Sequence, residues 1–203
     1  PLFSVTPASA EGVTGTVNIK PVTADDLECK FTSGMDVMEV YPKTVVTGRV
    51  KAESREGLNF MCSIERHHAS GKIGRCFVKG FDLKGGAIAQ TVGHDAHNIT
   101  VLGDNTADMA LAVNSLGKDG GLVLVRDGKL VGKVSLEIAG LMSAKNADEV
   151  LAERAHLTKA LVEMSYNHKI EPFMLLSFLS LIVIPELKLN QSGLFSVSEW
   201  RYV

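Results

Sequence analysis

Cysteine is scarce in this chain, and its spacing excludes several classes of protein. Cys29, Cys62 and Cys76 are the only three in 203 residues, an odd number without a Cys-x-x-Cys pair. Neither a disulfide framework nor a zinc knuckle fits that pattern. We expect three reduced thiols, which are typical of a cytoplasmic protein.

Long hydrophobic runs and an excess of one charge are also missing. The longest apolar run covers residues 173–184 and is interrupted by Ser177 and Ser180. It is shorter than the roughly 20 residues that a helix needs to cross a bilayer. The formal net charge is −2, and no cluster of Lys and Arg alternates with aromatic residues, as a nucleic-acid surface would require. We therefore expect neither a membrane nor nucleic acid as a partner.

The composition is instead that of a globular protein. Hydrophobic residues make up 45% and charged residues 22% of the chain, which is enough apolar surface for a substantial core. Residues 12–20 and 37–51 are rich in Val and Thr, which predicts short strands, and Thr23 is placed to cap a single helical turn. We interpret residues 1–59 as a small β-rich lobe that precedes a larger domain, residues 60–203.

Strands and turns alternate at the start of the larger domain. The segments 73–79 and 86–92 have strand-like composition and are joined by a glycine-bounded link, which predicts two adjacent antiparallel strands. Further along, Asp127-Gly128 lies between two hydrophobic runs. Asp-Gly in that context is one of the clearer local signals of a hairpin.

Two main helices are predicted among these strands. Asn105 or Thr106 can cap the first, and the second is expected over residues 146–166. The apolar run at 173–184 fits a buried helix or a central strand, and an exposed tail is expected from residue 185. The predicted fold is α+β, with a mostly antiparallel or mixed sheet and two main helices.

Histidines are concentrated in two short clusters. Four of the six lie between residues 64 and 99, beside acidic and basic side chains. Imidazole titrates near neutral pH and binds metals, which favours a functional site over a core. His94 and His97 are spaced to share a metal only if their loop folds back, so a polar contact to a substrate or an interface is the stronger hypothesis. The candidates are Glu65, His67, His94, Asp95, His97 and Asn98; no catalytic or metal-binding residue is assigned. Pairing of segments 73–79 and 86–92 would carry His94 back toward His67, so we expect these side chains to line one shared pocket or cleft, with Asn98 at its edge.

A simpler interpretation competes with that one. Exposed polar clusters beside turns are common in proteins, and on a strand Glu65 and His67 would share one face while Arg66 and His68 share the other. Only one of these pairs could then line a pocket.

Several ordered blocks of the sequence match one known family. The chain resembles the C-terminal domain of bacterial adenine deaminases, members of the amidohydrolase superfamily, from about residue 13 to residue 197. The blocks that carry the resemblance are Glu65-Arg66-His67, Gly71-Lys72-Ile73-Gly74, Phe77-Val78-Lys79-Gly80-Phe81, Thr91-Val92-Gly93-His94-Asp95-Ala96-His97-Asn98-Ile99, Gly140-Leu141-Met142-Ser143 and Val183-Ile184-Pro185-Glu186-Leu187-Lys188-Leu189. Positions that depart from the family pattern include Gly93, Ala96, Ile182 and Asn190-Gln191.

The resemblance implies an activity that this chain would not carry alone. It implies hydrolysis of adenine to hypoxanthine and ammonia by an enzyme that uses manganese, iron or zinc. In the family those metals belong to a (β/α)-barrel that precedes this domain, and we expect that barrel outside the 203 residues. The chain alone is expected not to deaminate adenine, because activating water for the attack generally needs a metal.

Three functional hypotheses follow from the sequence. The chain is a subunit or fragment of an adenine deaminase that works with a metal-bearing barrel as its partner. Alternatively, it binds a purine or related small molecule without catalysis, or it is an oligomerisation module in which the histidines lie at an interface. We expect a homo-oligomer, since a domain that evolved against a barrel would expose an apolar patch, for which the strand-rich segment 37–50 is the candidate.

Overall fold

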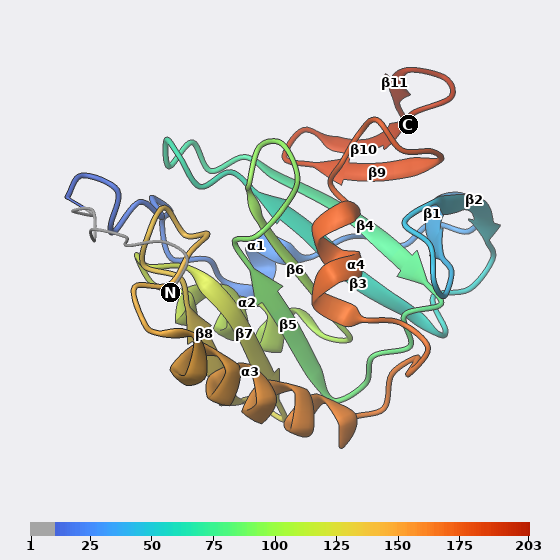
Figure 1. Cartoon of the computed structure of the whole chain (residues 1–203). Helices are drawn as coiled ribbons and strands as arrows, with labels where there is room; N and C mark the ends of the chain where they lie inside the picture. The colour runs from blue at the N-terminus through green and yellow to red at the C-terminus, as the bar shows by residue number, and fades with distance from the viewer. Residues whose placement is uncertain (1–10) are drawn as a thin grey trace.

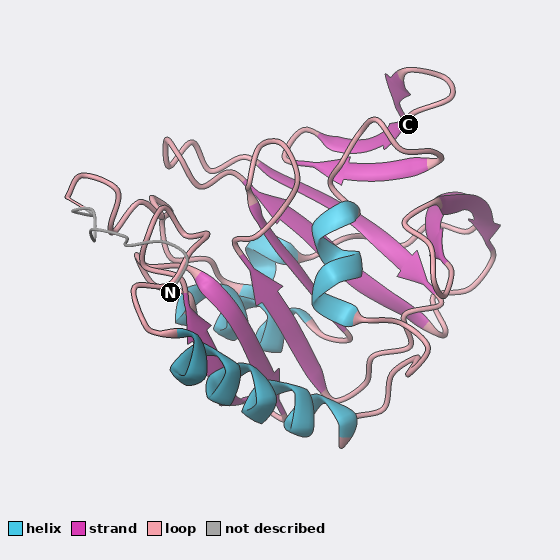
Figure 2. Ribbon diagram, viewed as in Figure 1, coloured by secondary structure: helices cyan, strands magenta, loops and turns pink. Residues whose placement is uncertain are grey.

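One mixed sheet of eight strands forms the centre of the molecule (Figures 1 and 2). The computed structural model describes residues 11–203. The strand order is β2-β1-β4-β3-β6-β5-β7-β8, and all neighbours are antiparallel except β1 and β4. The strands are β1 (Met35–Val40), β2 (Thr47–Ala52), β3 (Leu58–Ile64), β4 (Ile73–Lys79), β5 (Gly86–Gln90), β6 (Ile99–Gly103), β7 (Gly121–Arg126) and β8 (Lys129–Ser135).

β4 and β5 are not neighbours, so the predicted pairing of these two strands is wrong. β4 lies between β1 and β3, while β5 lies between β6 and β7. The link between them therefore crosses β3 and β6 instead of closing a hairpin. Phe81 and Leu83 of this link are buried in the core, 0% and 1% exposed. A local turn pattern cannot reveal that a link is held by distant core contacts.

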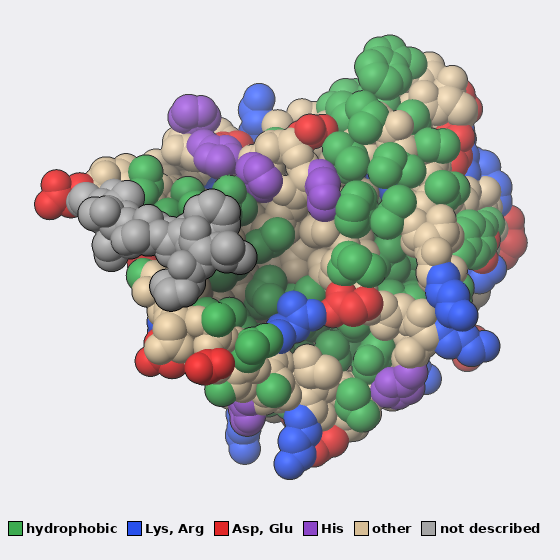
Figure 3. All heavy atoms as spheres, viewed as in Figure 1, with side chains coloured by type: hydrophobic (Ala, Val, Ile, Leu, Met, Phe, Trp, Pro, Cys, Tyr) green, Lys and Arg blue, Asp and Glu red, His purple; other side chains and the backbone are tan. Residues whose placement is uncertain are grey.

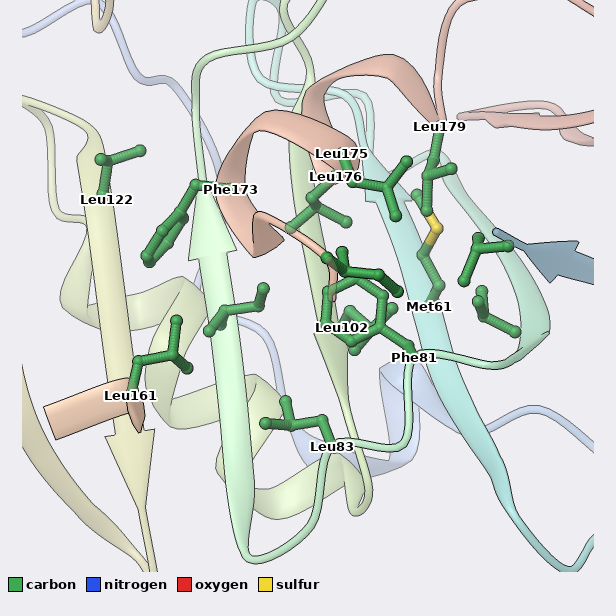
Figure 4. Packing of buried hydrophobic residues seen from close by; sticks show 14 of the residues in the cluster. Met61, Phe81, Leu83, Leu102, Leu122, Leu161, Phe173, Leu175, Leu176 and Leu179 are labelled. Atoms are coloured by element: carbon green, nitrogen blue, oxygen red, sulfur yellow. The ribbon is translucent and has the colours of Figure 1, made fainter. Parts of the chain in front are cut away.

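Helices cover both faces of the sheet, as predicted for an α+β fold. They are α1 (Ala24–Leu27), α2 (Thr106–Ser115), α3 (Ala147–Val162) and α4 (Pro172–Phe178). Two hydrophobic clusters result, one under α1 and α2 and the other under α3 and α4. Figure 4 shows the second cluster, in which α4 packs over Met61 and Leu102 of the central strands. Burial of each such side chain contributes about 1.5–3 kcal/mol, more than a surface ion pair contributes.

Local capping signals identify where the helices begin. The Thr23 hydroxyl accepts a hydrogen bond from the Asp26 amide, as predicted, and Asn105 caps α2. Asn146 caps α3, which ends at Val162, four residues before the predicted end. The apolar run that follows forms the short helix α4 rather than a strand, with Pro172 in its first turn.

The C-terminal segment is not the exposed tail that the sequence predicted. It forms a small sheet, β11-β10-β9, with β9 at Leu187–Asn190, β10 at Gly193–Ser196 and β11 at Arg201–Tyr202. Leu187, Lys188 and Leu189 are fully buried against the larger sheet. Gly74 of β4 permits this contact, since a Cβ there would lie 1.8 Å from the backbone oxygen of Asn190.

The N-terminal segment contributes two strands to the large, eight-stranded sheet. Within residues 11–203, the stretch 12–20 holds only an isolated bridge between Thr14 and Ile138, so the strand predicted there is wrong. β1 and β2 form as predicted and extend the large sheet beyond β4. The first ten residues of the expected lobe lie outside the described residues.

No helix among residues 11–203 combines the length and the apolar composition needed to cross a membrane.

Candidate functional site

The two histidine clusters lie at one edge of the large sheet because β3 and β6 are antiparallel neighbours. Ile64, the last residue of β3, pairs with Ile99, the first residue of β6. The segment after β3 and the segment before β6 therefore meet. An imidazole nitrogen of His67 lies 2.7 Å from the backbone oxygen of Ala96. The sequence placed the clusters together through a β4–β5 pairing that does not exist, whereas the β3–β6 pairing is what joins them.

Glu65 organises its own loop. Its carboxylate accepts hydrogen bonds from the backbone amides of His67, His68 (2.9 Å) and Ser70 (3.1 Å), and from the Ser70 hydroxyl (2.8 Å). Burial opposes ionisation, but the bonds from Ser70 and the two histidine amides outweigh it and lower the pKa of Glu65 to about 2. With its oxygens engaged in this way, Glu65 holds the loop in shape.

Arg66 is a buried cation that ties three segments together. It is 2% exposed and donates from Nε to the His97 carbonyl and from Nη2 to the Ala139 carbonyl, at 3.0 Å for the latter. Burial lowers the pKa of its guanidinium. Gly140, at a φ of +71°, is required beside it, because a Cβ there would lie 2.8 Å from Nη1. The Gly140 turn thus approaches Arg66.

His94 and His97 are held in different ways. The Nδ1 atom of His94 lies 3.1 Å from the Ser177 carbonyl of α4, and its ring stacks on Phe178 with centroids 3.9 Å apart. Burial lowers the pKa of His97, as does the nearby charge of Arg66, against a hydrogen bond with the Gly93 backbone that raises it. The neutral imidazole of His97 is therefore favoured at pH 7, and its buried Nδ1 has no hydrogen-bond partner among residues 11–203.

Three of the six candidates line one small hollow. Its volume is about 150 Å³, and it opens between the loop before β6, the segment after α4 and the turn between β9 and β10. Its lining residues are Ser63, His94, Asp95, Ala96, Asn98, Ser180, Ile182, Asn190 and Gln191. Glu65 lines a different hollow, together with Ile19 and Gly71. His67 and His97 are in neither set. The structure thus brings the two loops together but divides the candidate residues between two sides.

A row of buried polar side chains lies beneath the hollow; the sequence prediction named Asn98 of this row among its candidates but missed Ser63, Thr100 and Gln90. Ser63 of β3 pairs with Thr100 of β6, which pairs in turn with Gln90 of β5. Asn98 precedes Thr100 by two residues and so shares its face. All four are at most 5% exposed. Polar residues at every second position of an otherwise apolar stretch, as in Asn98-Ile99-Thr100-Val101, are the signal that could have found them.

These polar side chains are only partly hydrogen-bonded. The buried atoms Ser63 Oγ, Thr100 Oγ1, Gln90 Oε1 and Asn98 Oδ1 have no partner within the described residues. The Asn98 amide nitrogen does donate to Gln191 Oε1, at 2.8 Å. A buried polar atom without a partner costs about 1–3 kcal/mol. The row is therefore the least satisfied part of the core.

The described residues do not supply a metal centre. Nowhere in residues 11–203 do three or more His, Cys, Asp or Glu side chains gather as a metal ion would require. His94 and His97 point to different partners, and Glu65 is bound by its own loop. A metal-dependent reaction would need ligands from outside this set.

Fold and site together define an α+β domain with a small polar hollow beside the edge where β3 ends and β6 begins. The model of the adenine deaminase C-terminal domain family matches residues 37–201. The chain belongs to that family, as the resemblance predicted.

Individual relatives agree with that assignment. The chain is 41% identical over 206 aligned positions to the adenine deaminase of Clostridium acetobutylicum, covering 94% of this chain and 36% of that protein. For the adenine deaminase of Dehalococcoides mccartyi the identity is 35%, with coverage of 100% and 38%. For adenine deaminase 1 of Rhizobium meliloti it is 41%, with coverage of 92% and 35%. The chain thus spans between 35% and 38% of the length of these curated relatives.

Proposed function

We propose that this chain is the C-terminal part of an adenine deaminase, an enzyme that hydrolyses adenine to hypoxanthine and ammonia. The observation that carries the proposal is the alignment itself, which covers 94% of this chain but only 36% of a relative named adenine deaminase. The remaining length of that relative has room for a metal-bearing barrel. The family's manganese, iron or zinc would be bound there, and activated water would come from there.

The partner of this chain is then the metal-bearing barrel, as a subunit or as a domain. Hydrophobic side chains gather over α4 and β9 on the face that also carries histidines (Figure 3). Exposed apolar residues near α4 include Met174 (59%), Val183 (61%), Val46 (44%) and Tyr41 (40%). The sequence placed the patch on residues 37–50. Val37 and Val40 of that segment are buried, whereas Tyr41 and Val46, in the loop after β1, are exposed. We propose that the barrel covers this face.

Two further proposals concern the state of the protein. The reduced cysteines, Cys29 half-buried and the other two buried, support a cytoplasmic location. The apolar face over α4 would drive self-association when no barrel covers it, which supports a homo-oligomer. Gel filtration with mass measurement at tens of micromolar tests this, and a strictly monomeric mass would contradict it.

Co-expression tests the main proposal. The matched partner is the C. acetobutylicum relative truncated where its similarity to this chain begins. We expect no adenine deamination by either piece alone, even with added manganese, iron or zinc, and deamination by the co-purified pair. The decisive contrary result is metal-dependent ammonia release by this chain alone that His94→Ala abolishes. A pair that forms a stable, metal-loaded complex without activity would also contradict the proposal.

The second candidate function is binding of a purine without catalysis. The polar hollow with its unpartnered atoms favours it, because such a site suits a small ligand whether or not a reaction follows. An oligomerisation module is the third, and the apolar face favours that one. Retained purine binding without reconstituted activity would select the second, and a large symmetric interface through His94 and Asp95 would select the third.

A further inference from the structure

The polar hollow has chemical features of a ligand site that the loops around it do not explain. Ser63 and Asn98 line it and are 0% and 5% exposed, and each has an oxygen without a partner in the described residues. Ser63 and Thr100 face each other across paired strands, yet both hydroxyl oxygens are unpartnered. Met61, the next residue of β3 on the same face as Ser63, belongs to the hydrophobic cluster under α3 and α4. The row thus forms the boundary between the apolar core and the hollow.

The lining of the hollow offers two buried oxygens that can accept a hydrogen bond and have no partner within the described residues, Ser63 Oγ and Asn98 Oδ1. The Asn98 amide nitrogen is already used by Gln191, which leaves Oδ1 to accept. His94 Nδ1 lies against the Ser177 carbonyl, so Nδ1 carries a proton and is already used as a donor. Asp95 adds an exposed carboxylate at the rim, and no Lys or Arg lines the hollow. A ligand that suits this set is not an anion and presents N–H donors.

The volume limits the ligand to one ring. A cavity of about 150 Å³ holds a single benzene-sized ring, whereas complete ligand pockets measure roughly 300–1,000 Å³. Ala96 and Ile182 add apolar wall next to the polar row, which is the environment that a flat heteroaromatic ring prefers. The amino-bearing six-membered ring of adenine meets both conditions. Water is the other occupant that would satisfy the row.

We infer that this hollow binds an amino-substituted heteroaromatic ring, with Ser63 and Asn98 accepting hydrogen bonds from its amino group. The choice of adenine as the ligand rests on the proposed function, whereas the site itself rests on the unpartnered atoms.

Binding to the full 203-residue chain tests the inference directly. The probes are adenine, purine, which lacks the amino group, and hypoxanthine, which has a carbonyl in its place. We expect saturable ¹H–¹⁵N shifts at Ser63, Asn98 and Gln191 with adenine, and at least tenfold weaker binding of the other two. No saturable shift with millimolar adenine would show that only water occupies the hollow. Equal binding of all three probes would also overturn the inference.

Two variants separate binding from folding. Ser63→Ala removes an unpartnered hydroxyl, so we expect adenine affinity to fall about tenfold while the unfolding midpoint of the free chain stays level or rises. Asn98→Leu removes the acceptor and should lose adenine, whereas Asn98→Asp keeps an acceptor and should bind within a few-fold of the parent chain. Ser115→Ala, a change on α2 under the opposite face of the sheet, is the matched control and should bind normally.

The outcomes distinguish this inference from the proposed function. Loss of both stability and binding in Ser63→Ala, with both intact in Ser115→Ala, would assign Ser63 a structural role and overturn the inference. Failure of the co-expressed pair to deaminate adenine would contradict the proposed function, whereas specific adenine binding by this chain would still establish the hollow as a site.

Discussion

Polar side chains near the end of β3 and the start of β6 differ in how completely they are hydrogen-bonded. On one side, the charged residues Glu65 and Arg66 are engaged by backbone groups of neighbouring loops. On the other, the uncharged residues Ser63, Thr100 and Asn98 each keep an atom without a partner. Charged residues that a sequence analysis selects first can therefore have a structural role. Uncharged polar residues that it overlooks can keep an atom free to bind a ligand.

The sharpest test of this difference is Arg66→Ala. Its loss would leave the His97 and Ala139 carbonyls without their donor and open a cavity, so we expect a loss of about 3–5 kcal/mol in the free energy of unfolding. Urea denaturation measures it. Arg126→Ala is the matched control, since Arg126 makes an exposed ion pair with Glu163 and its loss should cost less than about 1 kcal/mol. Similar small costs for both would refute a structural role of Arg66.

Lys188 shows whether burial of a cation is stabilising in itself. It is 0% exposed, donates to the Val45 carbonyl at 2.8 Å, and burial lowers its pKa to about 8. The unfolded chain therefore binds more protons than the folded chain between about pH 8 and 10.5, and stability should rise with pH over that window. We expect Lys188→Met to remove this rise and to stabilise the protein at pH 7 by about 1–3 kcal/mol.

A pH series of unfolding curves on the parent chain and Lys188→Met measures this effect. Lys129→Met, at an exposed lysine, is the control and should retain the rise. A Lys188→Met variant that is less stable at pH 7 would show that the hydrogen bond to Val45 outweighs the cost of burying the charge.

Glu65 should also make stability depend on pH, but at acid pH and by a smaller amount than Lys188. Its pKa of about 2 in the folded chain lies below the usual value near 4.5, so its stabilisation is present above about pH 4.5 and is lost as pH falls toward 2. We expect Glu65→Gln to cost about 1–2 kcal/mol at pH 7 and to flatten the acid limb of the stability curve. Exposed Glu56→Gln should leave that limb unchanged, and identical limbs in the two variants would contradict the proposed loop-holding role.

Thr100→Val has the smallest expected effect and the opposite sign. The variant keeps the shape of the side chain and removes a hydroxyl that has no partner, so stability should change by less than about 1 kcal/mol, toward a higher unfolding midpoint. Thermal unfolding followed by circular dichroism measures it. A loss above about 1 kcal/mol would mean that this hydroxyl is satisfied by ordered water, and the contrast between the two sides would weaken.

Prediction from the sequence succeeded where a structural signal is local. Asn105 and Asn146 cap helices through amides three residues away, and Asp127-Gly128 closes the β7–β8 hairpin. The chain also revealed its family, which the match over residues 37–201 confirms. The assignment of Glu65, His67, His94, Asp95, His97 and Asn98 to substrate or interface contact stays a prediction.

Local sequence signals did not predict which strands pair with each other. The link of residues 80–85 resembles a turn, yet Phe81 is buried under α4 and the chain passes two strands before β5 begins. Which strand pairs with which depends on the fit of side chains far apart in sequence, and that fit leaves no local pattern. The loops that carry His67 and His94 meet through the pairing of β3 with β6, a different pair of strands from the one predicted, and His67 contacts the Ala96 carbonyl there.

The sequence by itself therefore determined the family, through the resemblance of its ordered blocks. It also determined the α+β class and the helix starts, because capping and hydrophobic periodicity act over a few residues. Only the tertiary structure decided the strand order, the burial of Lys188 and the separation of Glu65 from the hollow that His94, Asp95 and Asn98 line. It also placed the unpartnered oxygens of Ser63 and Asn98 in one hollow. Whether a polar atom finds a partner depends on the positions of all its neighbours, and those are set only when the whole core packs.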